Sequence, residues 1–303
     1  MALTPLPSSV IQMMASKEHR LWHYLWHGIR DTWERLTEAE QQSILDVHPG
    51  WKPPRPSRDK DDKVIRDNNS GEDFLYMHRI MIMMVNGILS NGGNPNYPWV
   101  QGWKKVPRPW DRDYPVPPIY SHPEDNMNTA LKRVKDNAFW QSFAVQEQRF
   151  LDPDYLRSVT LGELGSDLEW SIHNTMHIRW STESPMGYRP NIKLNEPVDE
   201  KWNKPEYNWL GDTYSSHVHP IFWKIHGWVD DRIDDWKRVN RVDDYEWKGT
   251  WIGNFAPPGH HHHDPHHLTT LEETSGGLEE LEKVAGILGN TGKCRGFFYD
   301  FLE

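Results

Sequence analysis

The sequence has very little cysteine and no long apolar run. Cys294 is the single cysteine among 303 residues, so neither an internal disulfide nor a cysteine-rich metal site can form within the chain. No stretch reaches the roughly 18 apolar residues that a membrane helix requires, and the mean hydropathy is −0.82. We therefore expect a protein without a membrane partner, and any metal must be held by histidines and carboxylates.

Positive charge is also scarce relative to negative charge. The chain has 34 Lys and Arg against 44 Asp and Glu, which gives a formal net charge of −10. Such a balance disfavours binding to a phosphate backbone, so we expect no nucleic-acid partner. The first residues lack the basic and then apolar pattern of a secretory signal. A cytoplasmic location is the resulting expectation, with a removed export signal as the alternative.

Histidine and tryptophan are both abundant, at 17 residues each. Many of them are close neighbours, as in Trp22-His23 and Trp26-His27. One interpretation is a tryptophan-rich core that contains hydrogen-bonded histidines. The other is a metal site with aromatic walls.

The apolar periodicity predicts a mainly α-helical protein with long loops. Thr37 and Glu40 form the pattern of a capping box at the start of one helix. Long loops over 49–73 and 90–125 are unusual unless they build a site. We find no domain boundary and expect a single domain over 1–303, with 255–303 as a possible C-terminal lid or tail. The predicted helices span 8–36, 36–48, 74–89, 125–150, 166–180, 219–239 and 270–289.

Three histidines have the spacing of metal ligands. His173 and His177 are four residues apart in "HNTMH" and would share one face of a helix. His226, in "HPIFWKIHGWVDD", could add a third ligand from another helix. Imidazole suits copper, zinc, iron and nickel alike. Asp230, one turn after His226, could accept the remaining ring N–H of a ligand and fix its tautomer.

These two stretches resemble the second-copper signature of the tyrosinase/hemocyanin type-3 copper family. The matching positions after the histidine pair are Asn174, Pro220, Phe222, Trp223, His226 and Asp230. Upstream, "FLYMHR" resembles the first-copper signature through Phe74, Leu75, His78 and Arg79. The resemblance covers 74–79 and 168–236 in the order of the family.

The chain departs from the family pattern at four positions. His219 stands where the family usually has Asp, and Met77 where it has Trp. Asn69 occupies the place of a copper-binding histidine, and Asn86 that of an acidic residue. The second half of the site therefore resembles the family closely, and the first half only in part.

The resemblance implies a helical bundle around a tyrosinase-like di-copper centre, with three histidines for each copper. It also implies O2 as co-substrate, ortho-hydroxylation of a phenol and oxidation of a catechol to a quinone. Within the family, the stretches "GEDFLYMHR" and "HPIFWKIHGWVDDRI" resemble those of bacterial tyrosinases that mature pyoverdine-type peptides. The expected substrate is thus a phenolic small molecule or a tyrosine-containing peptide.

The family pattern leaves the first copper's ligands partly open. His78 matches directly, and His48, about 30 residues upstream, suits the family's first ligand. His27 or His23 could supply the third from the N-terminal helix, although amphipathic packing of Trp and His would explain at least one histidine there. We take His48, His78 and His27 as the expected set, beside His173, His177 and His226.

Two residues are candidates for catalysis by the same resemblance. In the family, a glutamate and the Asn after the first histidine hold a water that deprotonates the phenol. Asn174 matches that Asn, and Glu169 or Glu163 could be the carboxylate. A solvated helix face is the alternative for Glu169. His217 and His219 are expected to cap the helix that carries His226.

Two further segments invite metal or substrate roles. Residues 260–267 read "HHHHDPHH", which we expect to be an exposed loop, with copper loading as the alternative. The tail "FFYDFLE" contains Tyr299, which could plug the pocket, although terminal aromatic packing explains it as well.

Other functions remain open on the sequence alone. The main alternative is a tyrosinase-fold protein with a degenerate first site, which holds one metal and runs other chemistry or none. A non-enzymatic O2 or copper carrier is a third possibility.

Overall fold

The computed structural model describes residues 6–47, 49, 52–92, 98–123, 125–248 and 277–294. Helices dominate these residues. The β-type pairing within the described ranges consists of two isolated bridges, Arg58 with Val64 and Lys193 with Glu196. The expectation of a mainly α protein with long loops is confirmed.

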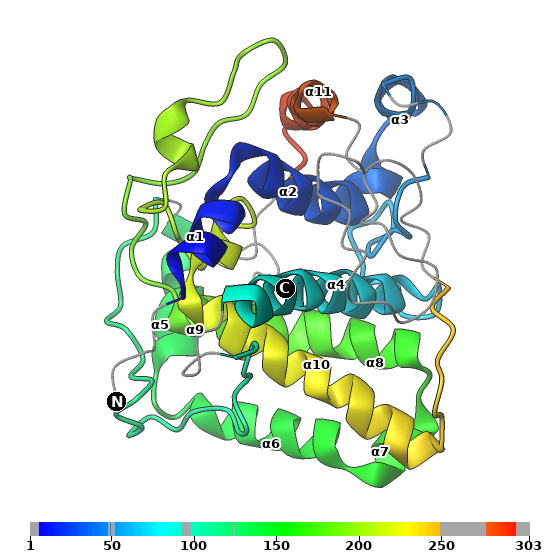
Figure 1. The fold of residues 1–303 in the computed structure, drawn as a ribbon, viewed down its shortest axis with the longest axis vertical. Helices are drawn as coiled ribbons and strands as arrows, with labels where there is room; N and C mark the ends of the chain where they lie inside the picture. The colour runs from blue at the N-terminus through cyan, green and yellow to red at the C-terminus, as the bar shows by residue number, and fades with distance from the viewer. Residues whose placement is uncertain are drawn as a thin grey trace.

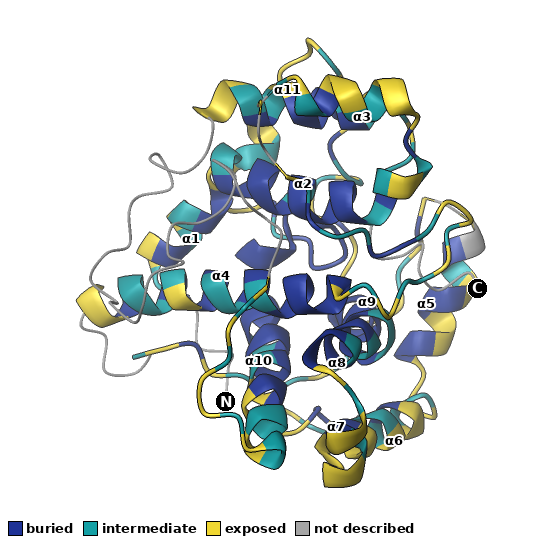
Figure 2. Ribbon diagram, turned by 90° about the vertical axis from the view of Figure 1, so that its right-hand side faces the viewer, coloured by how far each residue is buried: buried dark blue, intermediate teal, exposed yellow. Residues whose placement is uncertain are grey.

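The helices stack in approximate layers, which Figures 1 and 2 show from two sides. Helices α3 and α11 lie at one end with α2 beneath them, and α4 crosses the middle. Helices α8, α9 and α10 form the next layer, and α6 and α7 close the opposite end. The described helices are α1 (Ser8–Ala15), α2 (Lys17–Thr32), α3 (Glu38–Leu45), α4 (Ser70–Gly92), α5 (Asp125–Lys135), α6 (Trp140–Leu151), α7 (Pro153–Ser158), α8 (Leu161–Leu168), α9 (Asn174–Trp180), α10 (Pro220–Asn240) and α11 (Gly277–Asn290).

Helix α2 lies between α11 and α4 and is buried over most of its length (Figure 2). The predicted single helix over 8–36 is wrong in one respect, because the chain breaks at Ser16 into α1 and α2. Ser16 is extended there, and its hydroxyl accepts a hydrogen bond from the His19 amide. Such an N-cap satisfies a backbone donor that the helix itself leaves unpaired. The break lets α1 turn away while α2 enters the core.

Two capping boxes fix helix starts. The predicted box of Thr37 and Glu40 is present at the start of α3. A second box, of Thr160 and Glu163, starts α8 at Leu161, which is earlier than the expected start near Ser166. Glu163 is thereby occupied at the helix end, where the Thr160 backbone and hydroxyl donate to it.

Helices α4 and α8 cross in backbone contact at glycines. A Cβ built on Gly71 would lie 2.1 Å from the Gly162 carbonyl oxygen, and one built on Gly165 would lie 2.1 Å from the Gly71 oxygen. No side chain fits in such a crossing. The contact brings the start of α4 against the helix that leads to His173.

Helix α11 packs behind α2. The Leu288 side chain and the Cys294 sulfur lie within 2.8 Å of where a Cβ on Gly28 would stand. Within the segment 255–303, the described part is therefore a helix against α2. The histidine-rich stretch 260–267 and Tyr299 lie outside the described residues, so the ideas attached to them stay predictions.

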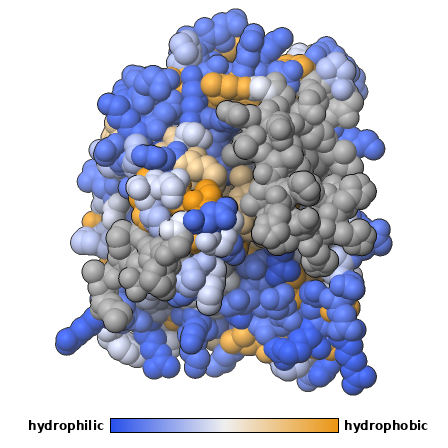
Figure 3. Space-filling model, in the orientation of Figure 1, coloured by the Kyte–Doolittle hydropathy of each residue, from blue (hydrophilic) through white to orange (hydrophobic). Residues whose placement is uncertain are grey.

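The face of the molecule in Figure 3 is mainly hydrophilic, with small scattered apolar patches. Among the described helices, none is long and apolar enough to cross a membrane.

We expect Gly165→Ala to destabilise the protein because its methyl group would meet the Gly71 backbone. Overpacking of this kind costs about 1–3 kcal/mol, against a gain of at most about 1 kcal/mol in helix propensity. Urea unfolding would measure the change. Gly92→Ala is the matched control, since nothing lies within 4 Å of its Cβ position. A Gly165→Ala protein as stable as the Gly92→Ala protein would contradict the crossing.

Candidate metal centre

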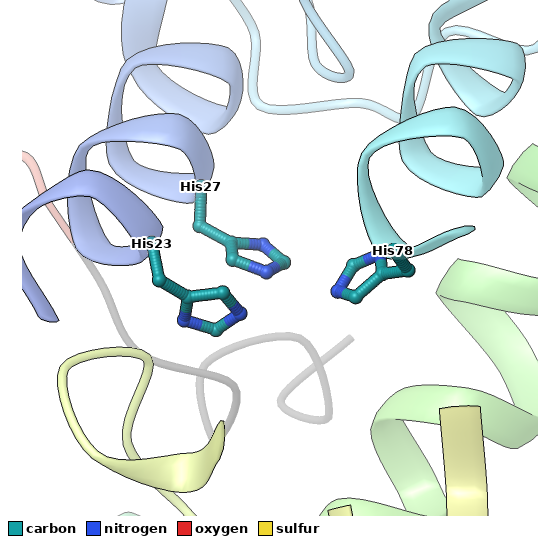
Figure 4. A group of neighbouring side chains, drawn as sticks. All are labelled: His23, His27 and His78. Carbon is teal, nitrogen blue, oxygen red and sulfur yellow. The ribbon is translucent and has the colours of Figure 1, made fainter. Parts of the chain in front are cut away.

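Six histidines form two buried triads in the core. His23 and His27 from α2 meet His78 from α4 (Figure 4), and His173, His177 and His226 meet from the α8–α9 segment and α10. In each triad, one nitrogen from every ring lies within 4.8 Å of the others. All six side chains are at most 3% exposed. The two sets are close enough to bind metal ions and are compatible with a two-metal site.

The second triad has the dimensions of a coordination shell. The three Nε2 atoms lie 3.1 Å apart for His177 and His173, and 3.2 Å apart for each of these with His226. Two nitrogens bound about 2.0–2.1 Å from one ion at a tetrahedral angle lie about 3.3 Å apart. The ring nitrogens are thus already placed for one ion.

The tautomers of the histidines in the second triad also favour metal binding through Nε2. His177 Nδ1 lies 3.0 Å from the Leu210 carbonyl oxygen, which can only accept, so this nitrogen carries the hydrogen. His173 Nδ1 likewise donates to Asn174 Oδ1 at 2.8 Å. The Nε2 atoms of both rings therefore present lone pairs to each other. Lone pairs at 3.1 Å repel unless a cation lies between them.

In the first triad, too, the Nδ1 atoms of His23 and His78 donate to acceptors, which here are backbone carbonyls of other residues. His23 Nδ1 donates to the Thr213 carbonyl at 2.5 Å, and His78 Nδ1 donates to the Phe74 carbonyl at 2.8 Å. The Nε2 atoms of His23 and His78 are buried and make no hydrogen bond to any residue that the structure describes. A backbone carbonyl on the far nitrogen is a usual way to orient a metal-binding imidazole. The chemistry of this donor set fits a metal ion.

The two triads touch. The His78 and His226 rings stack at 4.0 Å between centroids with an interplanar angle of 17°. His78 and His173 are 5.9 Å apart, which is within the range of ring separations found inside the first triad. The six rings therefore form one continuous cluster, which is compatible with a two-metal site.

Burial keeps these histidines neutral. It lowers the pKa of His27, His78, His173, His177 and His226 well below the ordinary value, and that of His23 to about 4. Desolvation is the largest cause in every case, because a charged ring loses its hydration in the core. Metal binding requires the unprotonated ring. The lowered pKa values keep the ligands ready at neutral pH.

Aromatic rings wall the cluster. Phe222 lies 3.9 Å from His226 between ring centroids, and Phe74 lies 4.7 Å from His78 and 4.8 Å from His173. Both phenylalanines are fully buried. The motif phenylalanines thus keep polar atoms away from both triads.

The structure brings five of the six expected ligand residues together in the two triads. The expected His27, His78, His173, His177 and His226 lie in the triads. His48 lies outside the described residues. His23, weighed as the alternative to His27, stands in the first triad together with it. The sequence signal was the four-residue spacing of the two on one helix.

The departures from the family pattern have local explanations. Asn69 adopts a left-handed conformation with φ of 61°, which Asn tolerates better than most residues, just before α4 begins. Its Oδ1 would lie 2.6 Å from a Cβ on Gly162. Asn86 accepts a hydrogen bond from the Val100 amide. His219 caps α10 through Nδ1, which accepts from the Ile221 amide at 3.1 Å, so it provides the acceptor that Asp would provide.

Asp230 does not hold a ligand ring, contrary to the expectation. Its carboxylate accepts a hydrogen bond from Arg79 Nε at 2.7 Å, and His226 Nδ1 has no hydrogen-bond partner within the described part of the chain. Arg79 follows His78 on α4, and Asp230 lies one turn after His226 on α10. The ion pair thus ties together the helices that carry the stacked rings.

Glu169 is buried and bound to Arg30, a residue that the sequence analysis missed. Arg30 donates through Nη1 to Oε1 and through Nη2 to Oε2, the latter at 2.7 Å, and Nη2 also donates to the Ser70 carbonyl at 2.8 Å. Burial raises the pKa of Glu169 to about 7, and the guanidinium opposes the rise. A solvated face is excluded. The available signal was an arginine one turn after His27 on a buried helix face.

The Glu169–Arg30 pair bridges both ligand helices. Arg30 stands three residues after His27, and Glu169 four residues before His173. Residues 169–173 form a π-helical turn, in which the Asn174 amide donates to the Glu169 carbonyl. Single π turns in α-helices often occur at functional sites. The pair holds this turn at a set distance from α2.

Comparison with known proteins adds no relative: no protein-family model matches the chain, and no curated protein sequence matches it either.

We expect His226→Ala to lose the metal of the second triad, because two imidazoles alone leave the ion half coordinated. Elemental analysis after metal loading and dialysis would show about one metal ion fewer per chain. His122→Ala is the control, since it removes a buried imidazole outside the triads. Serine should replace the histidines of 260–267 in every protein compared, so that they contribute no metal. Full metal retention in His226→Ala would refute the assignment.

We expect Glu169→Gln to destabilise the protein by about 3–5 kcal/mol, because it leaves the Arg30 charge buried without its partner. The free energy of unfolding measured in urea and the amount of metal retained should both decrease. Glu163→Gln serves as the control: it changes the same side chain at an exposed cap and should cost about 1 kcal/mol or less. Equal effects of the two substitutions would contradict the bridging role.

Proposed function

We propose that the protein is a copper-dependent phenol oxidase or monooxygenase that uses O2 at a two-metal centre. The observation that carries the proposal is the pair of contacting histidine triads, with His78 stacked on His226 at 4.0 Å. The resemblance of "FLYMHR" and "HPIFWKIHGWVDD" to type-3 copper signatures supports copper over other ions. A donor set made only of imidazoles is also one that copper accepts.

The histidines would bind the metals in this proposal, and backbone carbonyls would orient their rings. His23, His27 and His78 would hold one copper, and His173, His177 and His226 the other. Bound copper would supply the redox chemistry with O2. The backbone carbonyls of Thr213, Phe74 and Leu210 orient three of the rings.

The surrounding apolar wall has a chemical purpose. The buried rings of Phe74 and Phe222 pack against histidines of both triads and would keep solvent from metals bound there. A phenolic ring is apolar enough to enter such surroundings. We therefore propose a phenolic small molecule or a tyrosine side chain of a peptide as substrate.

Asn174 and Glu169 act on the ligands in this proposal. Asn174 Oδ1 accepts the Nδ1 hydrogen of His173 and keeps its Nε2 lone pair toward the metal. Both oxygens of Glu169 accept from Arg30, which favours a positioning role over proton abstraction. Within the structure as described, Glu169 is thus a support for the π turn that presents His173.

The first test is copper loading followed by activity. With serines in place of the histidines of 260–267, we expect two coppers per chain, an intense near-UV absorption band after addition of hydrogen peroxide, and O2 consumption with a monophenol or a catechol. Zinc-loaded protein should consume no O2, because zinc has no redox chemistry. His78→Ala should abolish O2 consumption in the copper-loaded chain.

The outcomes separate the competing functions. One metal per chain without the absorption band would indicate the degenerate single-metal protein. Two coppers that bind O2 reversibly but consume none with any phenol would indicate a carrier. Either result would refute the proposed oxidase.

A further inference from the structure

One ligand ring of the second triad lacks the hydrogen bond that orients its neighbours. In four of the other triad rings an acceptor takes the Nδ1 hydrogen and fixes the ring, as described above for His23, His78, His173 and His177. His226 Nδ1 has no such partner among the residues that the structure describes. Its Nε2 nevertheless lies 3.2 Å from the Nε2 atoms of both His173 and His177. The orientation of this ring must therefore come from another contact.

Two aromatic rings flank the His226 imidazole. Phe222, one turn earlier on α10, lies 3.9 Å from it between ring centroids, at an interplanar angle of 32°. His78 of α4 lies 4.0 Å away at an angle of 17°. Phe222 and His78 are themselves 6.1 Å apart, which is too far for two rings on the same face, so they approach the imidazole from two sides. Stacked contacts between aromatic faces are attractive and restrict the plane of the ring.

Phe222 is itself held firmly in place. Its side chain is fully buried. His219 caps the start of α10 three residues earlier, and the neighbouring Trp223 donates from Nε1 to the His217 carbonyl at 3.1 Å. Residues four apart on a helix share one face, so the Phe222 ring is a fixed surface for His226. His78, by contrast, is a ligand of the other triad.

We infer that Phe222 is the positioning residue of His226. Stacking on the Phe222 ring keeps the imidazole in the plane that aims Nε2 at the other two ligands, a task that hydrogen bonds perform for those two. The inference rests on the metal centre of the proposed function and does not depend on phenol oxidation. It assigns the motif phenylalanine a role in metal affinity as well as in packing.

Zinc binding by matched variants provides the test, with serines in place of the histidines of 260–267 in every protein. The parent chain should retain two zinc ions. Phe222→Leu keeps an apolar side chain but removes the stacking ring, so one of the two ions should bind about 10–100-fold more weakly, as for other partners that orient a ligand. A competing chelator would measure both affinities.

Phe150→Leu is the matched control. Phe150 is equally buried, on α6, where its ring packs beside Tyr155. This substitution should lower the free energy of unfolding in urea to a similar degree and leave both zinc affinities unchanged. If Phe222→Leu keeps both affinities, or if Phe150→Leu loses the same one, the positioning role is wrong.

A double variant tests whether Phe222 acts through His226. His226→Ala should retain one zinc ion, and adding Phe222→Leu should leave that number at one, because the effect of the second change has already been removed. Loss of the remaining ion would show that Phe222 supports the core in general and would overturn the inference.

The zinc-loaded parent chain decides the question even if Phe222→Leu fails to fold. The carbon-bound ring protons of His226, assigned by their absence from His226→Ala, should shift upfield in the NMR spectrum because two aromatic rings flank them. Ordinary shifts would refute the stacking. Zinc has no redox chemistry, so a failure of phenol oxidation leaves these results intact, whereas a parent chain without zinc would refute the metal centre as well.

Discussion

The structure depends on one electrostatic constraint, the gathering of neutral imidazoles with their lone pairs facing inward. Carbonyl acceptors on the outer nitrogens of His23, His78 and His177 fix the tautomers, so the inner nitrogens have no hydrogen to share. Without a cation this arrangement is repulsive, and with one it is a coordination shell. The arrangement is therefore compatible with a metal ion at each triad.

Two ion pairs hold the ligand helices against this repulsion. Arg79 and Asp230 join α4 to α10, and Arg30 and Glu169 join α2 to the turn before α9. Each pair lies within one turn of a ligand histidine. Together the two ion pairs fix how the ligand helices are oriented relative to one another. The orientation of the helices in turn sets the spacing of the histidine rings.

Much of this could be predicted from the sequence, and the limits are physical. The triad residues His173, His177, His226 and His78 could be singled out from helical spacing and from the resemblance of their motifs to type-3 copper signatures. The first triad was less certain because His19, His23 and His27 all share one face of α2, and periodicity cannot say which rings reach α4. The Thr213 carbonyl, 190 residues from His23, makes that selection.

The errors have the same origin. Asp230 was assigned to a ligand ring because its partner Arg79 lies 151 residues away and leaves no local signal. The break at Ser16 and the early start of α8 were missed because a capping hydroxyl competes with helix propensity at single positions. Local sequence patterns predicted the helices. The partners of individual side chains depend on contacts between segments that are distant in the sequence.

The packing of α11 against α2 bears on the order in which the two triads can assemble during synthesis. The histidines of α2 leave the ribosome first, yet the helix that backs them is made about 250 residues later. His173, His177 and His226 are all synthesised before α11 begins at Gly277. The second triad can therefore assemble before α11 is synthesised, whereas the first triad gains its full packing only after α11 has been made. The two triads would then become fully packed in a fixed order.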